Sequence, residues 1–309
     1  MGDATDTANE TPRGLLHPAV VWSRLRRNPP AVFGLCLAVF FVLMAVFAPL
    51  LAPHSPTQLD ASRMNEPPSW LPTGGQPSTP AQAEGRRFFG RDVAGRDILS
   101  RVIYGARTSL LVGVGVVSIA GLIGVLLGSL AGYCGGKVDA LISRAVDILL
   151  AFPFLILAIA VVSILPRTTM VHIAVVLGLT SWPGISRLVR GQVLATRELD
   201  FVSAARALGS SHARVLVLHI LPNCIAPVII WFAMGIAGAV MAEASLSFLG
   251  FGQEDSLSWG AMISIGLKAY LPDEWWAVAF PAGALALLVL AFNLLGDGLQ
   301  DALNPKQRR

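Results

Sequence analysis

The sequence predicts an all-α integral membrane protein with six transmembrane helices. Of its 309 residues, 54% are hydrophobic and only 14% are charged, and the mean hydropathy is +0.64. Soluble globular proteins carry about 25% charged residues. The apolar residues gather into six runs, each of roughly the twenty residues that cross a hydrocarbon core of about 30 Å. The length leaves no room for a soluble catalytic domain as well.

The chain opens with a polar tail and an apolar anchor. Residues 1–30 are predicted to form a cytoplasmic tail, and residues 31–52 form the first apolar run. This run is too long for the apolar core of a cleaved signal peptide, and no small-residue cleavage site follows it. We therefore expect an uncleaved N-terminal anchor helix.

A polar segment separates this anchor from the rest of the spans. Residues 53–107 are predicted to be extracytoplasmic and include a Pro-rich insert, about 67–87, for which the sequence indicates no role. Residues 108–298 are predicted to form a five-helix core, and residues 299–309 a cytoplasmic tail. The five runs of the core lie at about residues 109–131, 148–165, 169–185, 224–242 and 276–296. The third run of the chain is interrupted by Pro153.

The positive charges predict the orientation of the spans. Lys and Arg are concentrated in the N-terminal tail, in the link 133–144, in the loop 187–222 and at the C-terminus. Cytoplasmic loops of membrane proteins carry such an excess, so both termini are expected in the cytoplasm. The segment 53–107 departs from this rule, although long segments follow it poorly. Its arginines are Arg63, Arg86, Arg87, Arg91, Arg96, Arg101 and Arg107.

The first run of the core carries glycines at a helical spacing. Gly124, Gly128 and Gly132 are four residues apart, so they share one face of a helix. A face without side chains lets a neighbouring helix approach closely. We favour this interpretation over glycines that are scattered without a role.

The stretch from Asp200 to Pro222 is polar and helix-prone, and it lies between the fourth and fifth runs. Asp200 is predicted to be the N-cap of a short helix. Gly209 is predicted to end that helix by adopting a positive φ. Ser210 and Ser211 are predicted to cap a second helix that continues to the proline.

The short helix has a pair of small residues at its centre. Ala204 and Ala205, side by side, are predicted to form a face on which another protein can approach the backbone closely. A membrane protein that receives force from a soluble partner needs such a compact surface. A cytoplasmic loop that merely folds compactly is the alternative from spacing alone.

The same stretch resembles the cytoplasmic signature loop of bacterial ABC importer permeases. In that pattern an alanine pair is followed by a glycine four residues on and by a later Leu-Pro. The residues that match in register are Ala204, Ala205, Gly209, Leu221 and Pro222. Ser203 stands where the pattern has Glu, and His219 stands where it has Ile. A role for a carboxylate at the first position is therefore not carried over to this chain, whereas the small face and the glycine turn are.

Three further stretches resemble the permeases of dipeptide and oligopeptide importers. They are Gly95 to Leu110, Ser245 to Ile263, and Phe292 to Pro305, and the first apolar run is similar to the anchor of the "C" member of the permease pair. The resemblance implies a type I ABC importer permease fold with a short cytoplasmic coupling helix, in the bacterial inner membrane. The implied coupling residues are Phe201, Ser203, Ala204, Ala205, Arg206, Leu208 and Gly209.

The resemblance also implies partners. They are a second, similar permease, two cytoplasmic ATPases that carry ATP and Mg²⁺, an extracytoplasmic substrate-binding protein and the lipid bilayer. No cofactor is expected on this chain, and the implied cargo is a di- or oligopeptide, with glutathione or a nickel chelate as alternatives. The formal charge of +4 is too small to argue for nucleic acid.

The residues give little support for an enzyme or a metal protein. The stretch Gly135-Gly136-Lys137-Val138 lacks the earlier glycine and the Ser or Thr of a phosphate-binding loop. No HExxH or Gly-x-Ser-x-Gly motif occurs. We therefore expect no catalytic residue and no metal site on this chain.

The translocation path is predicted from four residues. They are Gly124, Gly128, Glu243 and Ser245. An acid within a span is costly and marks a wet path or a paired group, although Glu243 could instead reach the membrane interface at a helix end. Two rivals remain, a self-sufficient secondary carrier or channel and a non-transporting scaffold. The sequence contains no internal repeat or paired broken helices of a carrier.

Overall fold

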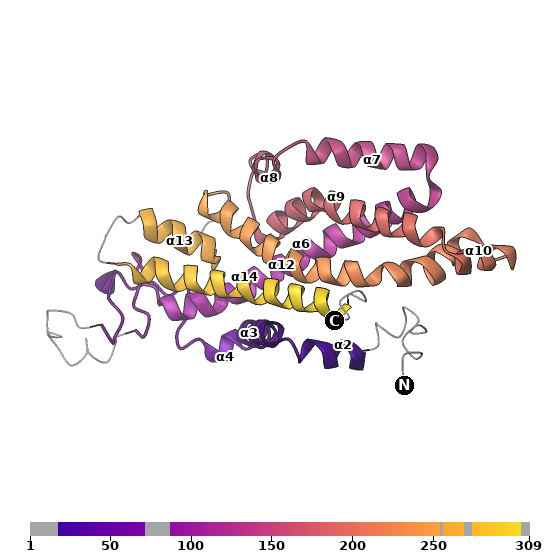
Figure 1. Cartoon of the computed structure of the whole chain (residues 1–309). Helices are drawn as coiled ribbons and strands as arrows, with labels where there is room; N and C mark the ends of the chain where they lie inside the picture. Colours follow the sequence, from indigo (N-terminus) through magenta and orange to yellow (C-terminus); the bar gives the residue numbers. More distant parts are fainter. Residues whose placement is uncertain (1–17, 72–86, 254–255, 269–273, 304–309) are drawn as a thin grey trace, which may run out of the picture.

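The computed structural model describes residues 18–71, 87–253, 256–268 and 274–303 (Figure 1). Within these ranges the chain is built from helices, and its only β-type pairing is an isolated bridge between Arg91 and Asp97. The all-α prediction is thus confirmed. Most of the predicted N-terminal tail, most of the Pro-rich insert with Arg86, and the end of the C-terminal tail lie outside the described residues.

The predicted anchor consists of two helices, α3 (Pro29–Val46) and α4 (Ala48–Leu51), and a further helix, α2 (Pro18–Leu25), lies within the range 1–30 that was predicted as a tail. Helix α3 begins where Asn28 caps the backbone N–H of Ala31 and two prolines occupy the first turn. Its small side chains pack on α14 (Trp276–Leu303), and most of its large apolar side chains face outward. This arrangement fits a helix with protein on one side and lipid on the other.

Helix α6 (Ile98–Cys134) has 37 residues and is about 55 Å long, more than a bilayer core requires. It begins inside the range 53–107 that was predicted to precede the core, because the Asp97 carboxylate caps the backbone N–H of Ser100. Gly135, at φ +66°, ends it.

The third predicted span is broken. Helix α7 (Gly136–Leu150) includes most of the link that was predicted as a short polar connection, and α8 (Phe154–Val162) follows at an angle of 86°. Pro153 stands at the bend, where its ring and missing N–H prevent one continuous helix. Helix α8 alone, with nine residues, is about 14 Å long and is too short to cross.

Helix α9 (Met170–Arg197) begins at a capping box between Thr169 and His172 and has 28 residues. After α9 come the short helix α10 (Asp200–Ala207), α12 (Ile225–Phe248), α13 (Trp259–Lys268) and α14. Helix α6 packs most extensively on α9, and α14 packs on α3 and α12. These contacts make one helical bundle.

Four described helices are long and apolar enough to cross a membrane. They are Pro29–Val46, Ile98–Cys134, His212–Phe248 and Trp276–Leu303, and the bent pair α7 and α8 makes a fifth if it counts as one span. Helix α9, which corresponds to the fourth predicted span, has the length but is less apolar, because arginines occupy its C-terminal half. Composition, and not length, therefore separates α9 from the other spans.

The glycine face of α6 is a helix contact, as its spacing predicts. A Cβ at Gly124 would meet Ile185 of α9, and one at Gly128 would meet the backbone of Ser186. A Cβ at Gly132 would lie 2.9 Å from the carbonyl oxygen of Arg190. The two backbones approach so closely that only glycine fits.

Three of the arginines that depart from the positive-inside rule, Arg91, Arg96 and Arg101, are partners of carboxylates. Arg91 pairs with Asp60 at 3.3 Å and with Glu66 at 3.1 Å. Asp92 pairs with Arg96 at 2.7 Å and with Arg101 at 3.7 Å. These groups tie the segment before α6 to the bundle, so their positive charge is locally balanced.

Candidate functional site

Helix α10 lies at one end of the molecule, opposite the end that carries α13 (Figure 1). Its N-cap is Leu199, the last residue with extended backbone (φ −77°, ψ 148°), and Asp200 is already helical. The prediction that Asp200 is the N-cap is wrong by one residue. Because its carboxylate lies in the first turn, it still interacts favourably with the helix dipole.

Gly209 ends α10 in the left-handed conformation, at φ +82°, as predicted. The N–H of Gly209 donates to the carbonyl of Arg206 at 2.9 Å, and the N–H of Ser210 donates to the carbonyl of Ala205 at 3.1 Å. This pair of bonds is a Schellman motif, which requires a residue with positive φ.

The two alanines do not form one exposed face, contrary to the prediction. Ala205 is 8% exposed and packs, with the fully buried Val202, in an apolar cluster with side chains of α9. Ala204 is exposed. Consecutive helical residues point about 100° apart, so neighbouring residues cannot share a face.

The outward surface of α10 carries the other predicted coupling residues. Leu208 is 87% exposed and Phe201 is 42% exposed. Ser203, Ala204, Arg206 and Gly209 are also exposed. Arg206 lies over the Tyr133 ring, 5.6 Å from its centroid. The result is an exposed apolar surface with a polar edge, and its coupling role stays a prediction.

The second helix of this stretch runs without a break into α12. Ser211 caps α11 (His212–Arg214) as predicted. A π-helical turn, Val215–Ile220, and a 3-10 turn, Leu221–Cys224, then lead to Ile225. The predicted boundary at Pro222 is therefore not a helix end, because these two turns accommodate the proline within one continuous helix.

The four residues predicted for the path do not lie together. Gly124 and Gly128 are buried against α9. Glu243 is fully buried, and its carboxylate accepts a hydrogen bond of 2.7 Å from Ser247. The carboxylate therefore has no exposed surface in this chain. Ser245 is half-buried and donates to the carbonyl of Met241. The path role of these residues stays a prediction.

Two cavities were not predicted from the sequence. One, of 370 Å³, is mainly apolar, and residues from α6, α7, α8, α9 and α12 line it. Its lining residues are Val116, Val117, Leu150, Phe154, Thr180, Ser181, Pro183, Gly184, Trp231, Gly235, Gly238 and Ala239. At Gly184 and Gly238 no atom lies within 4 Å of an added Cβ, so both glycines border open space. No spacing within one helix signals a cavity that five helices form together.

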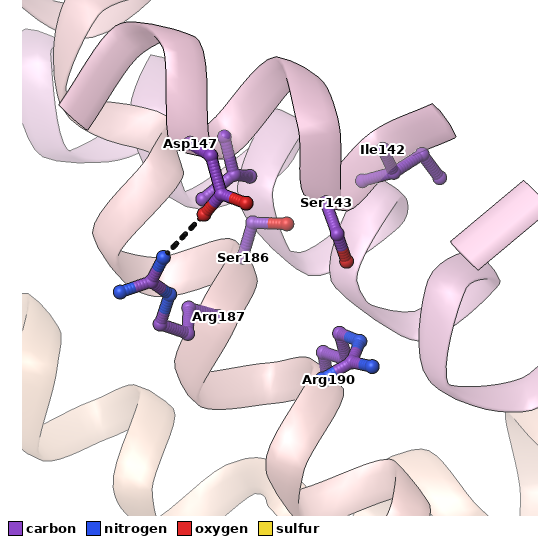
Figure 2. Close-up of a pocket in the computed structure, with 7 residues that line it drawn as sticks. Ile142, Ser143, Asp147, Ser186, Arg187 and Arg190 are labelled. Atoms are coloured by element: carbon purple, nitrogen blue, oxygen red, sulfur yellow. Dashed lines mark hydrogen bonds and ion pairs between the residues drawn. The ribbon is translucent and has the colours of Figure 1, made fainter. Parts of the chain in front are cut away.

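The other cavity, of 270 Å³, lies between α7 and α9 (Figure 2). Its lining residues are Ile142, Ser143, Val146, Asp147, Ser186, Arg187 and Arg190. In Figure 2 the Arg187 guanidinium reaches across the cavity to Asp147, at 2.8 Å. Within residues 18–71, 87–253, 256–268 and 274–303, no three His, Cys, Asp or Glu side chains are grouped so that they could hold a metal ion.

Two family models match different parts of the chain, and both describe membrane components of transport systems. Residues 124–309 match the family described as binding-protein-dependent transport system inner membrane component. Residues 19–68 match the N-terminal transmembrane domain of oligopeptide transport permease C.

Individual relatives are similar over nearly the whole chain. The dipeptide transport system permease protein DppC of Bacillus subtilis is 39% identical over 93% of this chain and 85% of its own length. The di/tripeptide permease DppC of Pseudomonas aeruginosa is 38% identical over 98% of both chains. The oligopeptide permease OppC of Haemophilus influenzae is 37% identical over 92% of this chain and 87% of its own. The chain therefore belongs to the family of inner-membrane components of binding-protein-dependent transport systems.

Proposed function

We propose that the chain is a membrane-spanning permease subunit of an ATP-driven importer of di- or oligopeptides. The names of its relatives support this cargo. It would act with a second, similar permease, an extracytoplasmic binding protein and two cytoplasmic ATPases. ATP and Mg²⁺ would bind to the ATPases, and this chain would have no catalytic site of its own.

The exposed apolar surface of α10 is the observation that carries the proposal. Leu208, 87% exposed, and Phe201, 42% exposed, are seven residues apart and so share one face of the helix. An exposed apolar patch of this kind, rather than a single exposed leucine, is typical of a docking surface. The buried face of the same helix, with Val202 and Ala205, fixes it to α9. A soluble partner that takes Leu208 and Phe201 into a groove would therefore move α9 with the helix.

This role assigns the end with α10 to the cytoplasm and places both termini there. Closure of the two ATPases on ATP would displace α10, tilt the attached spans and switch access between the two sides of the membrane. The apolar cavity beside Gly184 and Gly238 borders open space between the spans. It is a better candidate for part of the peptide path than the buried Gly124 and Gly128.

A self-sufficient carrier or channel is the rival function. A proton-coupled carrier needs several ionisable groups along its path. The ionisable side chains that are buried in the described parts of α3, α6, α12 and α14 include Arg101, near the start of α6, and Glu243, in α12. Arg101 pairs with Asp92 and is part of the ionic cluster before the core. In the described parts of these helices, no second acidic side chain lies beside Glu243. A proton on Glu243 therefore has no neighbouring carboxylate to which it could be transferred.

Reconstitution in lipid vesicles tests the proposal. The chain, its partner permease, both ATPases and the binding protein are combined, and the uptake of a labelled dipeptide and of a labelled tripeptide is followed. We expect uptake only with ATP and with all components present. Uptake by this chain alone, driven by an ion gradient and indifferent to ATP, would establish the carrier instead.

A further inference from the structure

Helices α6 and α9 form a tight pair at the end that carries α10. The glycine face of α6 leaves no space for side chains between the two backbones. In addition, the Arg197 guanidinium at the end of α9 donates to the carbonyl oxygen of Gly132 at 2.7 Å. Close-packed interiors transmit displacement rather than absorb it. The two helices therefore move together here.

Helix α10 belongs to the same rigid unit. Val202 and Ala205 pack in one cluster with Ile185, Val189 and Val193 of α9. Four of these five side chains have no exposed surface at all. A displacement of α10 is therefore passed to α9 and, through the glycine contact, to α6.

Helix α7 is attached to this unit in a different way. It lies on the outer side of α9 (Figure 1), and of its fifteen residues only Val146 is buried. The cavity of 270 Å³ separates much of α7 from α9. The apolar contacts of α7 come from Ile142, Val146 and Leu149, which pack in one small cluster with side chains of α6 and Trp182 of α9. The polar contacts with α9 therefore add to a limited apolar packing.

Two ion pairs cross from α9 to α7, and they differ in exposure. Arg187 and Asp147 are 60% and 59% exposed, and such solvent-exposed pairs contribute little. Arg190 and Asp139 are 35% and 21% exposed. Arg190 binds Asp139 through two parallel bonds, Nε to Oδ1 at 2.5 Å and Nη2 to Oδ2 at 2.7 Å. Ser143 donates to the same carboxylate at 3.1 Å.

We propose that Asp139 and Arg190 are positioning residues that transmit the movement of α10, through α9, to the broken span α7–α8. Bidentate guanidinium–carboxylate bonds fix orientation as well as distance. Asp139 lies in the first turn of α7, and the 86° bend to α8 follows at the other end of that helix. A shift of Arg190 along the α9 axis therefore swings α7 and changes that bend.

The inference rests on the proposed function, and its test uses the complete importer reconstituted in vesicles. The measured quantity is peptide taken up per ATP hydrolysed. We expect Asp139→Asn to lower this ratio by about two- to thirtyfold, the range found for mutations within coupling networks. ATPase binding to the permease should be unchanged. Arg190→Lys keeps the charge but loses the second bond, so it should give a smaller loss.

Two further variants separate positioning from simple stability. The exchange Asp139→Arg with Arg190→Asp restores an ion pair in the same place and should recover part of the ratio. Asp147→Asn removes the exposed pair on the same two helices and should leave the ratio within about twofold of wild type. An unchanged ratio in Asp139→Asn, or a loss of ATPase binding in that variant, would overturn the inference. If the wild-type chain binds no ATPase at all, the proposed function itself fails.

Discussion

The Asp60 carboxylate lies 3.3 Å from the Arg91 guanidinium, and it accepts a hydrogen bond of 2.6 Å from the Ser62 hydroxyl. The Ser62 bond, and then the charge of Arg91, lower the pKa of Asp60 below its ordinary value of 3.8. Arg91 itself is 5% exposed and also donates to the Gly95 carbonyl. One arginine thereby joins three parts of the segment that precedes α6.

This relationship predicts a pH dependence. A carboxyl whose pKa is lowered by folding stabilises the protein above its unfolded pKa, and that stabilisation is lost as pH falls through the folded value. We expect Asp60→Asn to remove this part of the acid sensitivity. The measurement is denaturant unfolding of both proteins in detergent at about pH 7 and about pH 3. Equal losses of stability in both proteins would contradict the prediction.

Leu208→Asp should weaken docking of the ATPases without unfolding the chain, because the side chain is 87% exposed and contributes little to the core. Burying an unpaired carboxylate in a partner's groove is strongly unfavourable. We expect at least about tenfold less ATPase to co-purify, equivalent to about 1.4 kcal/mol. Leu59→Asp is the matched control, since Leu59 is 67% exposed but precedes α6, far along the chain from α10. Similar recovery for both variants would contradict a docking role.

Gly209→Val should uncouple uptake while the chain remains in the membrane. No atom lies within 4 Å of an added Cβ, so the cost comes from φ +82° alone. A non-glycine residue in this left-handed conformation costs about 1–2 kcal/mol, and a β-branched residue costs more. The substitution therefore destabilises the Schellman motif that ends α10. Peptide uptake by membranes with matched amounts of protein is the measurement. Gly191→Ala, at an open helical position with negative φ, should take up peptide at the wild-type rate.

Ala204 and Ala205 should respond differently to the same substitution. Ala204→Trp adds a bulky side chain to the exposed surface of α10, so we expect normal expression and reduced ATPase binding. Ala205→Trp forces the side chain into a packed cluster, where overpacking costs about 1–3 kcal/mol or more. Its folded yield and melting temperature should fall. If Ala204→Trp melts earlier than Ala205→Trp, the assignment of the two faces is wrong.

Gly128→Leu should destabilise the bundle, because the Ser186 backbone occupies the space that a Cβ needs. We expect a loss of about 1–3 kcal/mol or failure to fold, seen in thermal unfolding of the purified chain. Gly184→Leu is the matched control, since nothing lies within 4 Å of that position. If Gly184→Leu melts at as low a temperature as Gly128→Leu, the close contact of Gly128 with α9 is not the cause of the destabilisation.

Features that depend on neighbours along the chain could be predicted from the sequence. Apolar runs indicated a helical membrane protein, the spacing of Gly124, Gly128 and Gly132 indicated a helix contact, and Gly209 indicated a left-handed helix end. Backbone conformation and helical periodicity are local properties, so a single sequence contains their signals. The family resemblance extended this reading to a fold that the comparisons confirm.

Only the tertiary structure decided which side chains meet. Asp139 and Arg190 are 51 residues apart, and Ala205 is buried because α9 and the turn Val215–Ile220 pack beside it. The two cavities likewise depend on several helices at once. The sequence by itself determined the kinds of element and their order. The packing of helices distant in sequence determined which charges are paired, which alanine is exposed and where space remains, because contact energies act between neighbours in space.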